Sequence, residues 1–323
     1  MRRVIALVTV AGMTVLGLVV VTGPAQAKVP GPNGRIAFER HDPASPDDTF
    51  LFTANPDGSH PLQLVPFHAG FPHWSPDGSE VVIAACLNPP TCDTGPIIVN
   101  PDTGSYRVLA MPDPTLFTGC SIWSPNAKRF ACEGNSDADP SRNGIYTVRT
   151  SDGGGLSRIT SIPGGHDSPI DYSPNGKRIV FVRTDPNGSP GKNQALFVVN
   201  VNGSGLRRIT SWGFSDDDGS WSPDGTKIVF EHFGSLFTVH PDGTGLVKIP
   251  LQTRSSTTAF TASDAGWSPD GTKLVFSLNT RGSAGSVQEG IGTANADGTD
   301  VRMITSSPTR DDKADWGPHP LAT

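Results

Sequence analysis

The sequence of 323 residues lacks the short motifs by which several classes of enzyme are recognised. It has no Gly-x-Ser-x-Gly segment, so the nucleophile turn of an α/β-hydrolase is excluded. Its eight histidines form neither His-Glu-x-x-His nor His-x-His pairs, so zinc chemistry has little support. Its Asp-Gly turns lack the alternating oxygen ligands and terminal glutamate of a calcium-binding loop. No local motif therefore points to catalysis or to a resident metal.

Basic residues are in the minority, with 25 lysines and arginines against 31 aspartates and glutamates. The balance is more acidic, at 23 against 31, when Arg2 and Arg3 are removed with a leader peptide. Nucleic acid and anionic membrane surfaces are poor partners for such a chain. Glycine (37 residues) and proline (30 residues) are abundant instead, and tight turns account for them without disorder.

The first 27 residues predict a secretory signal peptide. Arg2 and Arg3 precede an apolar stretch over residues 4–21, and Ala25-Gln26-Ala27 has the Ala-x-Ala form of a signal peptidase site. We therefore expect a signal peptide over 1–27, one domain over 28–323, and a secreted or extracytoplasmic protein of the periplasm or cell envelope. The apolar stretch borders on membrane-spanning length, so an uncleaved anchor is the alternative. No cysteine follows this stretch, which disfavours a lipid anchor.

One short phrase, an aromatic residue followed by Ser-Pro-Asp-Gly or a close variant, recurs six times. The aromatic residues are spaced 46 to 49 positions apart, and they are Trp74, Trp123, Tyr172, Trp221, Trp267 and Trp316. A period of about 40–50 residues with four short strands is that of a propeller blade. Proline presets the second turn position and glycine closes the fourth, so the phrase itself predicts a tight hairpin turn.

Apolar, β-branched segments around each turn predict a four-stranded meander in every unit, with strands A to D counted outward from the aromatic residue. The predicted second strands are 80–86, 128–132, 177–182, 227–230 and 273–276. The third are 51–54, 97–99, 145–148, 196–199, 236–239 and 291–294, and the clearest fourth strands are 156–160, 206–210 and 301–305. The last unit has no second strand of its own, but residues 32–38 supply a matching turn and strand. The first and last units are therefore expected to share a sheet that closes the ring.

These residues carry a family resemblance. An Asn-x-Asp-Gly hairpin, an Arg-Arg-Ile-Thr strand such as 207–210, and Trp-Ser-Pro-Asp-Gly-x-Lys-Ile-Val-Phe over 221–230 together resemble the TolB-type repeat, over about residues 32 to 320. The resemblance implies an all-β, six-bladed β-propeller of four-stranded antiparallel blades. It leaves function open, because propellers of this type serve as partner-docking modules, gates on peptidases and enzyme scaffolds. The separate amino-terminal α/β domain of TolB is not expected here.

Four cysteines in an exported chain predict two disulfide bonds. Cys86 ends a second strand and Cys92 precedes a third, which favours a Cys86–Cys92 pair. Cys120 begins a first strand and Cys132 ends the adjoining second strand, which favours a Cys120–Cys132 pair. Free buried thiols are the alternative.

Meander geometry puts the tight turns on one face of the ring and the variable loops on the other. The variable loops between second and third strands are 41–48, 87–94, 133–143, 184–194, 231–234 and 278–289, and a rigid scaffold that carries varied loops usually recognises ligands there. Loops entering the first strands converge on the channel mouth, where we expect a ligand-binding rim of His166, Asp167, Trp212, Phe214, Asp216, Asp217, Asp218, Asp264, Asp311 and Asp312. The same loops carry Phe67, His68, Phe71, His73, Phe117 and Phe260. The alternative is structural: aspartates that cap turns and aromatic residues that pack between blades.

Three functions are compatible with such a rim. The favoured one is a non-catalytic binding or scaffold propeller that docks a protein or cell-envelope ligand, with no catalytic residue and no resident metal, and a monomer is expected. The alternative is a metal-dependent lactonase or lyase with a divalent cation such as calcium at the channel mouth. A third is a purely structural surface protein. Three carboxylate or imidazole groups within ligating distance at the channel axis would favour the enzyme.

Overall fold

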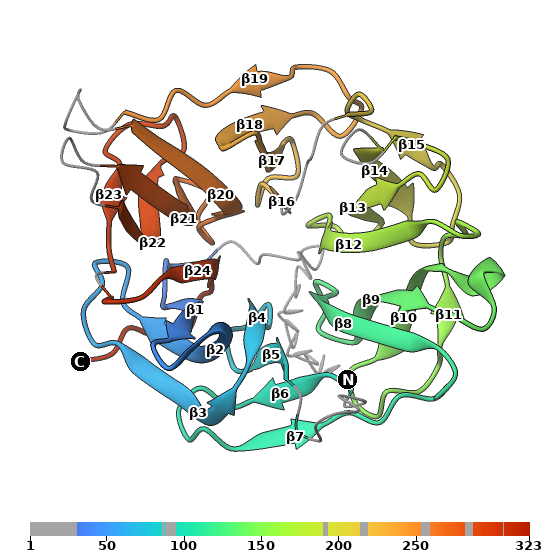
Figure 1. Ribbon diagram of the computed structural model, residues 1–323, viewed down its shortest axis with the longest axis horizontal. Coiled ribbons are helices and arrows are strands. Elements are labelled where there is room, and N and C mark those ends of the chain that lie inside the picture. Colours follow the sequence, from blue (N-terminus) through green and yellow to red (C-terminus); the bar gives the residue numbers. More distant parts are fainter. Residues whose placement is uncertain are drawn as a thin grey trace, which may run out of the picture.

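The computed structural model describes residues 31–85, 87, 95–189, 193–213, 219–252, 259–281, 287–305 and 307–323. Six four-stranded antiparallel sheets stand in a ring around a common axis (Figure 1). The colours of the ribbon, from blue to red, follow the chain around this ring. The predicted all-β, six-bladed propeller is confirmed. The one helical element in these ranges is a short 3-10 turn, Pro140–Arg142, and no helix among them is long and apolar enough to cross a membrane.

Each blade repeats the same order from the axis outward. The innermost strands are β4 (Gly70–Trp74), β8 (Phe117–Trp123), β12 (His166–Tyr172), β16 (Gly219–Trp221), β20 (Ala259–Trp267) and β24 (Asp311–Trp316). The second strands are β5 (Val81–Ala84), β9 (Arg129–Asn135), β13 (Arg178–Thr184), β17 (Ile228–His232), β21 (Lys273–Arg281) and β1 (Ile36–Asp42). The third are β6 (Ile97–Val99), β10 (Gly144–Arg149), β14 (Gln194–Asn200), β18 (Ser235–Val239), β22 (Val287–Asn295) and β2 (Ser45–Ala54). The outermost are β7 (Tyr106–Val108), β11 (Ser157–Arg158), β15 (Arg207–Arg208), β19 (Val247–Lys248), β23 (Arg302–Met303) and β3 (Leu62–His68).

Several strand boundaries differ from the prediction. The loops predicted at 41–48 and 278–289 are largely strand, because β1 runs to Asp42 and β21 runs to Arg281, which pairs with Val287 of β22. These extensions are polar and partly exposed, so no apolar run marks them in the sequence. The outermost strands β11, β15 and β23 are conversely two residues long, although five were predicted for each.

The Ser-Pro-Asp-Gly turn is held by its own side chains. In the turn after β16, Ser222 Oγ donates to Asp224 Oδ1 at 2.6 Å, and the backbone N–H of Lys227 donates to Ser222 Oγ at 2.9 Å. Burial opposes ionisation of Asp224, but the bonds that it accepts from Ser222 and Thr226 outweigh burial and lower the pKa of the carboxyl. Gly225 has φ 71°, which a residue with a Cβ rarely adopts. The recurrence of the phrase therefore has a local cause.

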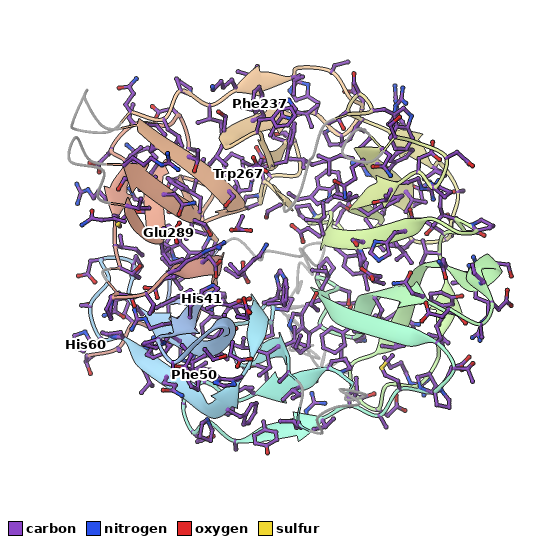
Figure 2. The ribbon with its side chains drawn as sticks, in the orientation of Figure 1. His41, Phe50, His60, Phe237, Trp267 and Glu289 are labelled. Carbon is purple, nitrogen blue, oxygen red and sulfur yellow. A yellow bond between two sulfur atoms is a disulfide. The ribbon has the colours of Figure 1, made fainter. Side chains whose placement is uncertain are left out.

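The apolar core is divided among the gaps between neighbouring blades. One cluster joins Val82 and Ile98 of one blade to Trp123, Phe130 and Val148 of the next. Equivalent clusters recur around the ring, so no single centre holds the molecule together. Along one radius, Trp267 on an innermost strand lies nearer the axis than Phe237 on a third strand (Figure 2).

The ring closes between the two ends of the described chain. Strand β1 pairs with β24, with Ile36 opposite Trp316, and the sheet order is β24-β1-β2-β3. Beyond the ladder, the N–H of Gly34 donates to the carbonyl of Gly317 at 3.0 Å, and Trp316 Nε1 donates to the carbonyl of Gly34 at 2.9 Å. The predicted closure by the amino-terminal strand is confirmed.

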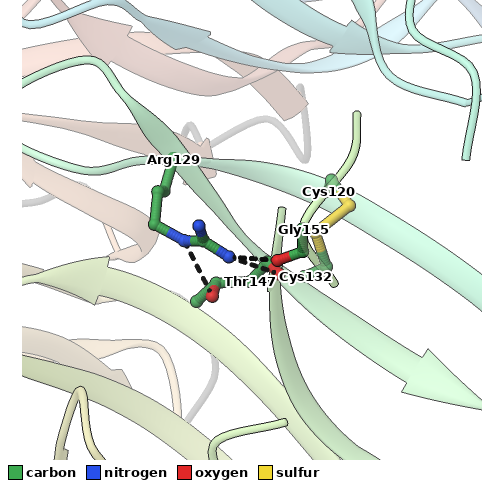
Figure 3. The surroundings of a disulfide bond; sticks show 5 residues. All are labelled: Cys120, Arg129, Cys132, Thr147 and Gly155. Atoms are coloured by element: carbon green, nitrogen blue, oxygen red, sulfur yellow. Dashed lines mark hydrogen bonds between the residues drawn. A yellow bond between two sulfur atoms is a disulfide. The ribbon is translucent and has the colours of Figure 1, made fainter. Parts of the chain in front are cut away.

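The predicted Cys120–Cys132 disulfide is present and joins β8 to β9 (Figure 3). The two residues face each other in the ladder, inside both strands and not at their ends as predicted. By register, Cys132 occupies the position that Phe181 and Phe230 hold in the next two blades. Close by, Arg129 donates to the side chain and carbonyl of Thr147, each at 3.0 Å. The predicted Cys86–Cys92 pair lies outside the described residues.

Substituting the closing tryptophan tests how much the ring depends on it. Trp316→Ala removes a side chain that is 2% exposed, together with its bond to Gly34, so we expect the free energy of unfolding to fall by about 3–5 kcal/mol in chemical denaturation. Trp212→Ala is the matched control, because Trp212 is 37% exposed and its loss leaves a smaller cavity. Equal losses for the two variants would contradict the assigned role of the closure.

The disulfide makes a separate prediction. Replacing Cys120 and Cys132 together with alanine opens a crosslink between positions 12 residues apart, which is expected to lower stability by about 3 kcal/mol. Denaturation of the wild-type protein with and without reductant should reproduce the difference. A double variant as stable as the oxidised wild type would contradict it.

Candidate binding site in the channel

A pocket of about 440 Å³ lies along the axis and is lined by the innermost strands of all six blades. Its wall also includes Glu133, Val182 and Thr184 at the ends of second strands, and Gln194 at the start of a third. These four residues lie on the face that carries the variable loops, so the pocket reaches the predicted working face. We call it the channel pocket.

Three residues that line the channel pocket have an uncommon backbone conformation. Phe71, Asp264 and Lys313 have φ of 52°, 53° and 51°, in the left-handed region that residues other than glycine seldom occupy. Each lies three positions before the repeat tryptophan of its strand, where the ladder between first and second strands is interrupted by a bulge. Such conformations persist only where the surroundings hold them, and they are concentrated at functional sites.

Side-chain bonds hold these three residues across successive blades. Lys313 Nζ donates to Asp264 Oδ1 at 2.6 Å, and Ser277 Oγ donates to Asp264 Oδ2 at 2.5 Å. The N–H of Phe71 donates to Glu39 Oε1 at 2.6 Å, while Lys313 Nζ lies 5.8 Å from the centre of the Phe71 ring. Burial raises the pKa of Glu39, although the bond from Phe71 opposes that shift. Phe71, Asp264 and Lys313 thus form one connected group, here called the strained cluster.

A second polar group lies on the opposite side of the ring. Glu133 of β9 accepts from Ser168 Oγ at 2.8 Å through Oε2, and its Oε1 lies 2.6 Å from His166 Nε2. Burial opposes the charge on Glu133, but the bonds from His166, Ser168 and Asn135 lower its pKa. The contact with Glu133 raises the pKa of His166 against the effect of burial. The two side chains therefore form an ion pair across neighbouring blades.

Two further carboxylates of the pocket wall connect blades to one another. Asp171 Oδ2 accepts from the N–H of Trp221 at 2.9 Å, and Asp315 Oδ2 accepts from the N–H of Trp74 at 2.8 Å. In both cases the carboxylate precedes the aromatic residue of its own repeat and binds that of the next blade. These groups line the channel pocket and also fix the spacing of the ring.

The structure places some of the predicted rim residues in the channel pocket and others within the blades. His166 and Asp264 line the channel pocket. Asp167 is fully buried and accepts two bonds from Arg183, both at 2.7 Å, on the strand next to its own. Asp311 repeats this arrangement with Arg40, at 2.7 and 2.8 Å. These two aspartates hold first and second strands together and are not among the residues that line the pocket.

Two further predicted rim residues, Asp312 and Trp212, are not among the residues that line the pocket either. Asp312 pairs with Arg310 at 2.6 Å and lies 3.3 Å from His41. Trp212 packs against Phe197, with 5.6 Å between ring centroids. Phe214, Asp216, Asp217 and Asp218 lie outside the described residues.

Sequence reasoning missed Lys313, Glu133 and Ser168 as pocket residues. A usable signal existed for one of them. Lys313 stands three positions before Trp316, as Phe71 and Asp264 stand before Trp74 and Trp267, so alignment of the repeats on the tryptophan would have placed it in the channel. Glu133 and Ser168 meet only because the second strand of one blade faces the first strand of the next.

Comparison with known proteins identifies relatives over part of the chain. No protein-family model matches the chain. An uncharacterized protein of Agrobacterium fabrum (strain C58) is 32% identical over 168 residues, which make up 52% of this chain and 52% of that protein. The chain therefore spans about half the length of the curated relative it matches.

Solved structures share the fold. TolB from Acinetobacter baumannii has a TM-score of 0.66 at 20% identity, over 88% of this chain and 66% of that one. A putative TolB from Agrobacterium tumefaciens has a TM-score of 0.60 at 16% identity, over 89% and 100%. The fold is that of a TolB-type propeller. An oligogalacturonate lyase in complex with manganese shares it at a TM-score of 0.50 and 15% identity, over 87% and 75%. Because the TolB-type fold is found in an enzyme as well as in TolB, it does not itself decide between binding and catalysis.

The Glu133–His166 pair predicts a defined pH dependence. The stabilising contribution of Glu133, whose pKa is lowered, is present above its ordinary value of 4.5 and is lost as pH falls through the lowered value. The contribution of His166, whose pKa is raised, is present below its ordinary value of 6.5 and is lost as pH rises through the raised value. The pair is thus strongest between these two ordinary values.

Nuclear magnetic resonance titration of His166 measures this coupling. Its pKa should lie above 6.5 in the wild type and fall in Glu133→Gln, which keeps the shape of the side chain without the charge. An unchanged His166 titration in Glu133→Gln would show that no ion pair forms.

Proposed function

We propose that this protein is an exported, non-catalytic binding propeller that docks a protein or cell-envelope ligand on the face bearing the channel pocket. The observation that carries the proposal is the strained cluster at the pocket wall. Three consecutive blades each place a non-glycine residue in a costly conformation at the same position, and interblade bonds hold all three. Such preorganisation suits recognition, because the groups that meet the ligand are fixed before it arrives.

Two observations support export. The Cys120–Cys132 disulfide suits an oxidising compartment. The predicted signal peptide over residues 1–27 agrees with it, although those residues lie outside the described part of the chain. Secretion or residence in the cell envelope is therefore the proposed location.

The charges of the channel pocket favour binding over acid–base catalysis. Lys313 is paired with Asp264, and His166 is paired with Glu133. Asp171 and Asp315 accept backbone bonds that hold neighbouring blades. Charged groups that support the scaffold in this way are poorly placed to change protonation during a reaction.

A metal-dependent enzyme remains the alternative, and one observation bears on it. Glu39, His41 and Asp312 offer ligand atoms within 4.8 Å of one another, the one such group among the residues described. They belong to β1 and β24, and none of them lines the channel pocket. Glu39 is bonded to Phe71, and Asp312 is paired with Arg310. A cation would have to displace these contacts, so the donor set fits a metal poorly.

The docking function can be tested with two phenylalanine variants. Phe71 is 54% exposed at the pocket, and Phe233 is 71% exposed in a loop on the same face but outside the pocket wall. Both have positive φ, so asparagine, which tolerates that conformation, is a matched replacement at each position. Immobilised wild-type protein should retain partners from a cell-envelope extract. Immobilised Phe71→Asn should retain at least several-fold less of the same partners. Phe233→Asn should behave as wild type.

The contrary result is equally clear. If both variants and the wild type capture the same partners in the same amounts, the channel pocket is not the docking site. Circular dichroism of the three proteins establishes that any difference is not caused by unfolding.

A further inference from the structure

We infer that the ligand of the channel pocket is a neutral glycan, recognised through the hydroxyl groups of one or two sugar residues. The inference rests on the proposed function, since it names the chemical class of the ligand at the same pocket. Three properties of the pocket wall lead to it: charged groups that already have protein partners, neutral polar groups, and an exposed aromatic ring.

Four charged side chains of the pocket wall form two ion pairs on opposite sides of the ring, and two further carboxylates, Asp171 and Asp315, accept backbone N–H bonds from neighbouring blades. Lys313 with Asp264 connects the blades of β24 and β20, and His166 with Glu133 connects the blades of β12 and β9. An anion would face these four carboxylates, and a cation would have to share carboxylates that already bind a cationic side chain or a neighbouring blade, so both kinds of ligand cost desolvation energy. A sugar hydroxyl can donate to the carboxylate and accept from the adjacent cation without disturbing the pair.

The pocket wall also presents neutral hydrogen-bonding groups. Ser121, Thr184 and Gln194 line the pocket, and each of their side chains can both donate and accept. Ser220 lines it too, but its hydroxyl already donates to Asp171 Oδ2 at 3.2 Å. The one bond described from the Gln194 amide is a long one, 3.4 Å to Thr184 Oγ1. Neutral donors and acceptors of this kind match hydroxyl groups better than they match a compact charge.

Phe71 supplies the apolar contact that sugar recognition also needs. Phe71 is 54% exposed although its backbone N–H is bonded to Glu39, so its ring is open to a ligand. The face of an aromatic ring is electron-rich and attracts the weakly positive C–H groups on one face of a pyranose.

The size and openness of the channel pocket fit the end of a longer chain. A volume of about 440 Å³ lies within the range of small-molecule sites, which is about 300–1,000 Å³. The wall extends to Glu133, Thr184 and Gln194 on the loop-bearing face. One or two terminal sugars can therefore enter while the rest of the glycan lies outside over the loops.

Calorimetric titration of the purified protein tests the inference. The probes are tetrasaccharides of glucose (α- and β-linked), N-acetylglucosamine, mannose and galactose, each at millimolar concentration, with tetralysine and tetraglutamate as charged probes. At least one neutral tetrasaccharide should bind, with an affinity that changes little when salt is added, because no net charge is neutralised. Neither charged peptide should bind.

Variants test whether the sugar binds in the channel pocket. Phe71→Asn should weaken sugar binding by about threefold to tenfold, the range expected for loss of one aromatic contact. Asp264→Asn, which preserves both side-chain shape and tolerance of positive φ, should weaken it by about tenfold or more because a charged acceptor is lost. Phe233→Asn should bind like the wild type. Circular dichroism checks that each variant is folded.

Each contrary outcome has a distinct meaning. If no neutral tetrasaccharide binds, or if binding survives both Phe71→Asn and Asp264→Asn, the glycan inference is overturned. If partner capture depends on Phe71 but no sugar binds or competes, the docking function stands and the inference fails. If a sugar binds with the expected dependence but capture is independent of Phe71, the protein-docking function fails and the glycan inference stands.

Discussion

The pairing of β1 with β24 is the constraint on which the rest of the structure depends. Strands from the two ends of the described chain share one sheet, and the ladder is extended by the bonds of Gly34 with Trp316 and Gly317. A ring closed in this way has no exposed sheet edge at its seam. It also fixes the angle between successive blades, because six blades must complete one turn around the axis.

Closure turns a repeat in the sequence into a ring of equivalent positions in space. In three adjoining blades the residues three positions before the tryptophan lie near one another, which is why Lys313 contacts both Asp264 and Phe71 although the three are far apart in the chain. The carboxylates of Asp171 and Asp315 use the same equivalence to bond the next blade. The scaffold and the channel pocket are therefore built from the same strands, and substitutions in the pocket act on both.

The predicted rim shows that residue type alone does not determine whether a side chain faces the channel. Acidic residues were expected at the channel mouth, and Asp264 does line the pocket, yet Asp167 and Asp311 are buried against Arg183 and Arg40. Asp167 and Asp311 stand at the start of a first strand, whereas Asp264 stands further along its strand, at the bulge. Successive side chains of a strand point to opposite faces, and a bulge shifts that alternation by one residue. Without the position of the bulge, the sequence cannot assign an aspartate to the channel or to the blade.

The sequence by itself determined the number of blades, the hairpin turns, the closing strand and the Cys120–Cys132 pair. Each of these depends on spacing along the chain and on local turn chemistry, and both can be identified directly from the sequence. Only the tertiary structure decided which side chains share the channel pocket, because Glu133 meets His166, and Lys313 meets Asp264, across blades. Those contacts depend on the angle between neighbouring sheets, which no local pattern encodes.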